Sequence, residues 1–295
     1  MTGFLAEFGQ KLADRWATLL AVPGLLYLAA VTAAAVLGQG HAVSYPDLSR
    51  KAAAWAASPT VKSAGGTALI IAAVLAGSVA AGLVAAAGGR LVERLWTLPG
   101  DRPPARWLAG WRRDRAQKLK VIADESLDPA TARRAMARAD LICLVEPACP
   151  TWIGDRLRAC HVRIDKAYGL DLAVTWPRLW LIVPDAVRAE LGTARDAFST
   201  AARLTAWAAL YLILGIWWWP AIPIAIVTGI AGASKGRLAA GNLADLIESA
   251  VDLHSRDLAA QMDENQAGPV TPAAGSGLSS RMRKSRWDPA SPLAD

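Results

Sequence analysis

Residues 204–234 read LTAWAALYLILGIWWWPAIPIAIVTGIAGAS and contain no charged side chain. A bilayer core is about 30 Å thick and a helix rises about 1.5 Å per residue, so roughly twenty apolar residues span it. A helix over this whole stretch would reach about 46 Å, which is too long for one straight span. The stretch predicts an integral membrane protein.

The middle of the stretch predicts a turn. Pro220 follows three tryptophans, and Pro223 comes three residues later. Proline removes a backbone donor and disfavours helical geometry in the residue before it, while tryptophan prefers the headgroup layer. We predict a hairpin of two transmembrane helices, 204–219 and 220–234; one kinked, tilted helix is the alternative. The predicted interface anchors are Trp217, Trp218 and Trp219.

Two more uncharged runs precede the hairpin. We predict a first span over 16–38, after an amphipathic lead over 1–15, and a second span over 67–89. Residues 39–66 then form a polar external loop. A cleaved signal peptide is the alternative for the first run, but its apolar part is too long and a second span follows.

Small residues recur every four positions along the second span, among them Gly77, Ala81 and Ala85. A face of small residues lets helix backbones approach closely, and in lipid this packing supplies much of the association. The pattern predicts a homo-oligomer contact through these residues. The alternative is that alanine is simply common in this chain.

Charge sets the predicted orientation. The chain has net charge +7 and 54% hydrophobic residues, and residues 90–203 carry twenty basic side chains against fourteen acidic ones. Basic residues accumulate on the cytoplasmic side of a membrane. We predict a mainly α integral membrane protein with about four transmembrane helices, a helical cytoplasmic domain over 90–203 and both termini in the cytoplasm. A cytoplasmic amphipathic helix over 235–264 and a disordered tail over 265–295 complete the expected organisation.

Two segments are predicted to contact the cytoplasmic leaflet. Residues 102–122 combine many basic residues with large apolar ones, which is typical of a helix on an anionic membrane surface. Nucleic-acid binding is the alternative, but no recognition module accompanies it, so we predict no nucleic-acid partner. Residues 171–184 carry tryptophans four positions apart, and Pro177 is predicted to break this segment. The alternative for the tryptophans is packing in the domain core. The candidate residues for contact with the membrane surface or a protein partner are Trp107, Trp111, Arg112, Arg113, Arg115, Asp155, Arg156, Asp171, Trp176, Arg178 and Trp180.

The sequence holds none of the strong catalytic or phosphate-binding motifs. Its cysteines and His161 lack the close pairs typical of structural zinc sites. Asp245, Glu248 and Asp252 share one helix face, a pattern that a solvated face explains better than a metal site. The predicted spans contain no ionisable residue, which disfavours a proton-coupled transporter. We predict no catalytic, cofactor-binding or metal residues and no cofactor.

The strings PTWIGDR at 150–156, YGLD at 168–171 and WPRLW at 176–180 resemble an uncharacterised family of bacterial multi-pass membrane proteins. The Trp-Pro turn and the closing helix around 246–254 share this resemblance, which covers roughly residues 140–262. It implies a protein of the bacterial plasma membrane with a shared central unit, and it transfers no catalytic residues. The Ala- and Arg-rich composition is similar to that of high-GC bacteria.

The sequence favours a non-enzymatic membrane scaffold or interaction protein whose cytoplasmic helical domain binds a protein partner or anionic lipid. One alternative is an oligomeric small-solute channel or permease. The other is a membrane-associated enzyme acting on a lipid or envelope precursor, with Asp155, Arg156 and Asp171 in its site.

Overall fold

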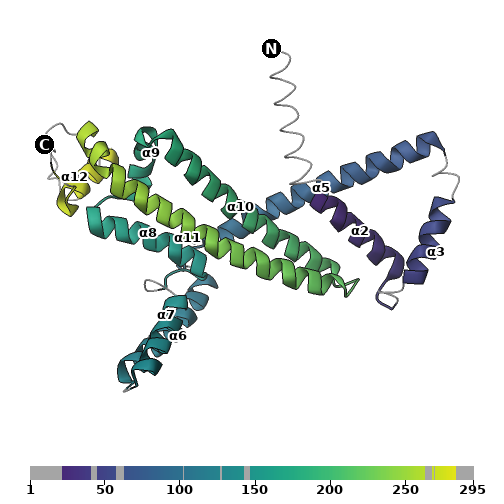
Figure 1. The fold of residues 1–295 in the computed structure, drawn as a ribbon, viewed down its shortest axis with the longest axis horizontal. Coiled ribbons are helices and arrows are strands. Elements are labelled where there is room, and N and C mark those ends of the chain that lie inside the picture. Colours follow the sequence, from purple (N-terminus) through teal and green to yellow (C-terminus); the bar gives the residue numbers. More distant parts are fainter. Residues whose placement is uncertain are drawn as a thin grey trace, which may run out of the picture. The chain divides into compact units, whose positions relative to one another are not determined.

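The computed structural model describes residues 22–40, 45–57, 63–101, 103–126, 128–142, 147–262, 268 and 270–283 (Figure 1). Every regular element in these residues is an α-helix, which confirms the predicted mainly α fold. The predicted lead over 1–15 lies outside the described residues. The helices are α2 (Val22–Leu37), α3 (Tyr45–Ala56), α5 (Ala64–Trp96), α6 (Ala105–Glu125), α7 (Pro129–Ile142), α8 (Trp152–Tyr168), α9 (Leu172–Ile182), α10 (Asp185–Leu214), α11 (Ala221–Met262) and α12 (Pro272–Arg283).

The helices form two compact units. The first contains the described residues within Met1–Glu93 and Ser199–Lys235, and the second those within Arg94–Phe198 and Gly236–Asp295. Helices α5, α10 and α11 contribute residues to both units.

A helical hairpin formed by α10 and α11 organises the first unit. Helix α10 ends at Leu214, and the backbone N–H of Ala221 donates to the carbonyl of Trp218 where α11 begins. Pro223 is the third residue of α11. The backbone N–H at that position has no partner inside a helix, so proline fits there without the loss of a hydrogen bond. Leu214, Ala221 and the half-buried Trp218 share a core cluster, while Trp217 and Trp219 are exposed. The predicted turn is confirmed.

Small residues hold α5 against its neighbours in the first unit. A Cβ on Gly24 of α2 would lie 2.2 Å from the carbonyl oxygen of Ser78, and one on Gly77 would lie 3.1 Å from Leu28. Ala85 is fully buried, and a Cβ on Gly88 would lie 3.0 Å from Ala206 of α10. The small-residue face is therefore used within the chain, and a subunit contact through it stays a prediction that would compete with α2 and α10.

Two helices of the described part are long and apolar enough to cross a membrane: Gly65–Trp96 of α5, and α10. The predicted first span begins in residues that are not described, and its described part, α2, has 16 residues. Helix α11 covers only about 21 Å before its first charged residue, Lys235. The count of four spans therefore remains a prediction.

The second unit is built around α8 and the later part of α11. Its main core cluster includes Cys160 and Ile164 of α8, Leu179 of α9 and Val251 of α11. A second cluster centres on the fully buried Phe198, whose ring packs against Trp96 with centroids 5.6 Å apart. The end of α5 is therefore held in this unit.

Local signals set the ends of α8 and α9. The N–H of Gly154 donates to Thr151 Oγ1 at 3.0 Å, and Gly169 ends α8 with a φ of 66°, which a glycine adopts without strain. The Asp171 side chain then caps α9 through the N–H of Ala173. Pro177 was predicted to break this segment, but it lies inside α9. That prediction is wrong because capping and packing outweigh the single backbone bond that proline removes.

Residues 265–295 were predicted to be disordered, and for the described residues 272–283 this is wrong. They form α12, whose Leu278 and Met282 are buried in the main core cluster of the second unit. Gly275 allows this packing, because a Cβ there would lie 1.8 Å from the carbonyl oxygen of Tyr168. Composition could not predict the helix, since its stability comes from tertiary contacts made through small residues.

Candidate docking surface

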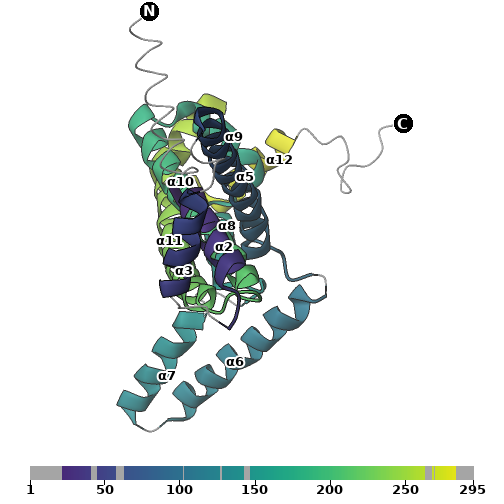
Figure 2. The same cartoon turned by 90° about the vertical axis from the view of Figure 1, so that its right-hand side faces the viewer.

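Helix α6 has one packed face and one bare face. Its buried residues Ala105, Ala109 and Ala116 form the face that packs, and the neighbouring α7 buries Ala135 and Ala139 (Figure 2). The two helices are an antiparallel pair whose small side chains allow close approach. The large apolar side chains Trp107 and Trp111 of α6 point away from this contact.

The bare face presents two tryptophans four residues apart. Trp107 is 69% exposed and Trp111 is 61% exposed, and residues at this spacing lie on one side of a helix. Val121 and Ile122 continue the apolar surface toward the end of α6. Exposed aromatic side chains in such a row are unusual on a protein surface that faces only water, and they indicate a contact site.

Basic side chains accompany the tryptophans. The guanidinium of Arg115 lies 5.5 Å from the ring centroid of Trp111, a cation–π geometry. Lys118 lies one turn further on. The exposed acidic side chains on this face are Asp114 and Glu125, since Glu125 follows Lys118 by seven residues and so lies on the same side of the helix. Helix α6 as a whole carries six basic residues against three acidic ones. This exposed face combines Trp107 and Trp111 with Arg115 and Lys118, and the helix that carries it has a net positive charge; it is called the α6 face below.

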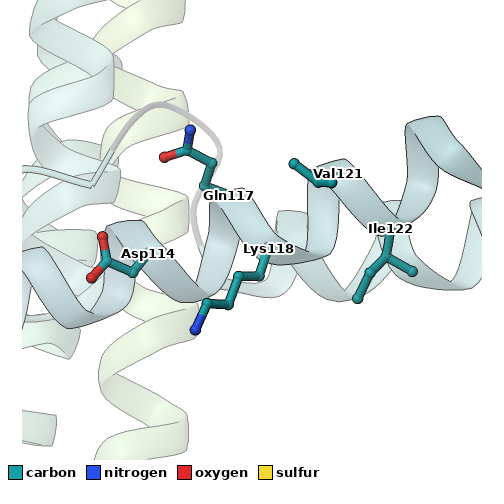
Figure 3. Close-up of a pocket in the computed structure, with 5 residues that line it drawn as sticks. All are labelled: Asp114, Gln117, Lys118, Val121 and Ile122. Carbon is teal, nitrogen blue, oxygen red and sulfur yellow. The ribbon is translucent and has the colours of Figure 1, made fainter.

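A groove of about 500 Å³ runs along the α6 face. Figure 3 shows the Asp114 carboxylate and the Lys118 amine reaching out from the helix, with Val121 and Ile122 further along. The described lining residues, Asp114, Gln117, Lys118, Val121 and Ile122, all belong to α6.

Arg112 was predicted to contact the membrane surface or a partner, but it points into the second unit. Its Nη1 donates to Asp155 Oδ2 at 2.6 Å and to the carbonyl of Cys149 at 2.7 Å. Arg113 donates to the carbonyl of Pro147. Helix α6 places Arg112 on its packed side and Arg115 on its bare side, a distinction that sequence proximity could not make.

Asp155 was also predicted to contact the surface, and the structure gives it an internal role. Its side chain is 4% exposed. Besides Arg112, it accepts from the backbone N–H groups of Ala148 at 2.9 Å and Cys149 at 2.7 Å. Asp155 therefore fastens the segment before α8 and ties α6 to α8.

Arg156 and Asp171 likewise join helices. Arg156 is 7% exposed and donates to Asp245 and, at 3.4 Å, to Glu248 of α11. Asp171 accepts from Arg283 of α12 at 2.7 Å, and this hydrogen bond is the main cause that holds the pKa of Asp171 below its usual value. The carboxylates that the sequence grouped as a solvated face are thus in part ion-pair partners of α8.

The two tryptophans of α9 have different surroundings. Trp176 packs against the core clusters, as its alternative interpretation expected, whereas Trp180 is 37% exposed. Arg178 donates to carbonyls of Val174 and, in α12, Met282. In both views α8 lies between α9 and the α6–α7 pair (Figures 1 and 2). The second unit therefore does not bring the two predicted surface segments together, and the α6 face is the stronger candidate.

The described cysteines sit in the core. Burial is the main cause that raises the pKa of the Cys149 thiol, with a smaller contribution from the charge of Asp155. Burial, followed by the charge of Glu248, raises the pKa of Cys160 to about 12. Among the described residues, no group of three or more His, Cys, Asp or Glu side chains is placed to hold a metal ion.

We expect Cys149 and Cys160 to resist maleimide at pH 7 until the second unit opens, because the thiolate is the reactive form. The measurement uses a chain carrying Cys143→Ser, because Cys143 lies outside the described residues and would add its own labelling. The raised pKa of Cys160 keeps its thiol protonated in the folded state. The contribution of this thiol to the stability of the second unit is therefore present below pH about 9 and is lost as the pH rises toward about 12. Maleimide labelling followed by peptide mass spectrometry measures the reactivity of both thiols and its change with pH. Rapid labelling of the folded chain at pH 7 would contradict the burial of these thiols.

Comparison with known proteins finds no match: no family model, curated protein or solved structure matches the chain. The role of the α6 face therefore rests on its own geometry and charge.

Proposed function

We propose that this protein is a non-enzymatic scaffold or interaction protein of the bacterial plasma membrane, with four transmembrane helices and both termini in the cytoplasm. The first unit spans the membrane in this proposal, and the second unit is the cytoplasmic domain that presents the α6 face. The resemblance of the 150–184 strings to a bacterial membrane family agrees with this assignment.

One observation carries the membrane assignment: the charged ends of three apolar segments meet at one level of the first unit. Gly89 precedes Arg90 in α5, and a Cβ on it would lie 3.1 Å from the Cα of Arg203 in α10. A Cβ on Gly232, three residues before Lys235 in α11, would lie 3.0 Å from the backbone nitrogen of Thr205. Charges that gather at one level beside apolar helices are typical of a membrane boundary.

The surface on one side of this level supports the same proposal. Leu69, Leu83 and Val84 of α5 are more than half exposed, as are Val227 and Ile230 of α11. Such side chains favour lipid over water. At the far end of the unit, Gln39 Nε2 donates to the carbonyl of Ile216 at 2.6 Å, so the end of α2 lies beside the turn between α10 and α11. This pairing fits an outer face shared by the loop and the turn.

The topology can be tested with single cysteines in a chain carrying Cys143→Ser. We expect Trp55→Cys and Trp217→Cys to react with a membrane-impermeant maleimide in intact cells, and Leu253→Cys to react only after permeabilisation. All three positions are more than half exposed, so accessibility within the protein is matched. Reaction of Leu253→Cys in intact cells would overturn the proposed orientation. A Trp217→Cys that stays unlabelled on both sides would place the turn inside the bilayer and reduce the count of spans.

The other two functions predict different measurements. A channel or permease would give solute flux in reconstituted vesicles, and its proposed subunit contact competes with packing inside the chain. An enzyme would lose turnover when Asp155, Arg156 or Asp171 is changed, but each of these side chains already joins helices. The geometry therefore supports the scaffold proposal best.

A further inference from the structure

We infer that the α6 face docks on the anionic headgroup layer of the membrane in which the chain itself is embedded. This inference rests on the proposed function, because it requires the second unit on the side where anionic lipid and the basic residues meet. It names the partner of the α6 face and assigns separate tasks to its aromatic and basic residues.

Charge complementarity selects this partner over a second copy of the chain. Apart from Arg112 and Arg113, which bind inside the second unit, the α6–α7 pair carries seven basic residues against five acidic ones across 105–142. Two such pairs would repel each other, whereas a negative leaflet attracts each Lys or Arg near its surface. An acidic protein would satisfy the same charge, but the two exposed tryptophans match a headgroup layer, where indole rings are half wet.

The chain keeps the α6 face close to the membrane. Only eight residues separate Trp96, the end of α5, from Ala105, the start of α6, so the two ends can be at most about 30 Å apart. In the proposed topology Trp96 lies about 9 Å beyond the charged residue Arg90. Docking is therefore intramolecular, and a tether of this length allows weak individual contacts to hold the face in place.

The aromatic and basic side chains of the α6 face have different roles in docking. Trp107 and Trp111 insert their rings at the headgroup level, while Arg115 and Lys118 meet the phosphates. The packed side of α6 is fixed by Arg112, whose bond to Asp155 stops the helix from rolling and turning its tryptophans away. Asp114 and Glu125 oppose docking, since each places a carboxylate on the same face.

The test follows a nitroxide label on the full chain in nanodiscs. Ile122→Cys places the label on the α6 face, and Leu253→Cys on α11 is the matched exposed control, both with Cys143→Ser. In discs containing phosphatidylglycerol at low salt, we expect the label at 122 to gain access to oxygen and lose access to a water-soluble nickel complex. Discs of phosphatidylcholine alone, or high salt, should return it to water. The label at 253 should stay in water throughout.

Substitutions of the charged and the aromatic residues measure these two roles separately. Neutralising Arg115 and Lys118 together with glutamine should lower the ratio of docked to undocked chains about thirtyfold, or about fivefold for each charge. Asp114→Asn should raise the ratio. Trp107→Ala with Trp111→Ala should weaken docking even at low salt, and unchanged helix content by circular dichroism shows that each variant is folded.

Two outcomes overturn the inference while leaving the proposed function in place. The label at 122 could remain in water beside anionic lipid although Leu253→Cys maps to the cytoplasm. It could also become inaccessible to both oxygen and nickel only when a disc holds two chains, which would assign the face to a second copy. A Leu253→Cys that maps outside would instead defeat the proposed topology.

Discussion

Replacing Asp155 with alanine should destabilise the second unit by about 3–5 kcal/mol, the range for breaking a buried ion pair. The substitution leaves Arg112, 12% exposed, without its carboxylate and removes the acceptor of two backbone N–H groups. Arg112 keeps its bond to the carbonyl of Cys149, but its buried charge loses the carboxylate of Asp155, and this desolvation cost exceeds the lost attraction itself. Asp114→Ala is the matched control, because Asp114 is exposed on the same helix and should change stability by less than about 0.5 kcal/mol.

The alkylation rate of Cys149 under native conditions measures this effect directly. Its backbone N–H is one of the groups that Asp155 binds, so opening of this segment exposes the thiol. A loss of about 3–5 kcal/mol corresponds to an increase of roughly a hundredfold to a few thousandfold in the open population. Arg112→Met combined with Asp155→Leu should recover much of the stability, since both charges are then absent. A rate for Asp155→Ala equal to that of Asp114→Ala would show that the ion pair is not formed.

Gly275→Ala should release α12 from the second unit. The added Cβ would lie 1.8 Å from the carbonyl oxygen of Tyr168, and the nearest groups are backbone atoms that cannot rotate away. Displacing α12 exposes the buried side chains of Leu278 and Met282, each worth about 1.5–3 kcal/mol. It also separates Arg283 from Asp171, which lets the pKa of Asp171 rise toward its usual value.

Gly277→Ala is the matched control on the same helix, because nothing lies within 4 Å of a Cβ there. It should stabilise α12 slightly, since alanine favours a helix by about 1 kcal/mol over glycine. Trypsin cleavage at Arg281 and Arg283 reports the difference: Gly275→Ala should be cut much faster than the parent chain, and Gly277→Ala no faster. Equal cleavage of the two variants would mean that α12 is not held by the close approach at Gly275.

The sequence by itself determined the features that depend on neighbouring residues. Helix ends at Thr151, Gly169 and Asp171 follow from capping groups and a left-handed glycine, and the turn after Leu214 follows from the tryptophans and prolines. The apolar runs of α5 and α10 are readable because hydropathy sums along one segment. These features depend on residues that lie close together in the chain.

Only the tertiary structure decided which side of each helix is packed and which side is exposed. Arg112 and Arg115 are three residues apart, yet one binds Asp155 and the other lies over Trp111, because the alanines of α6 choose the packed side. Helix α12 exists because Gly275 lets its backbone approach α8, although its composition predicts disorder. Such contacts join residues far apart in the chain. Their free energy depends on shape and distance across the fold, which no local pattern of residue types records.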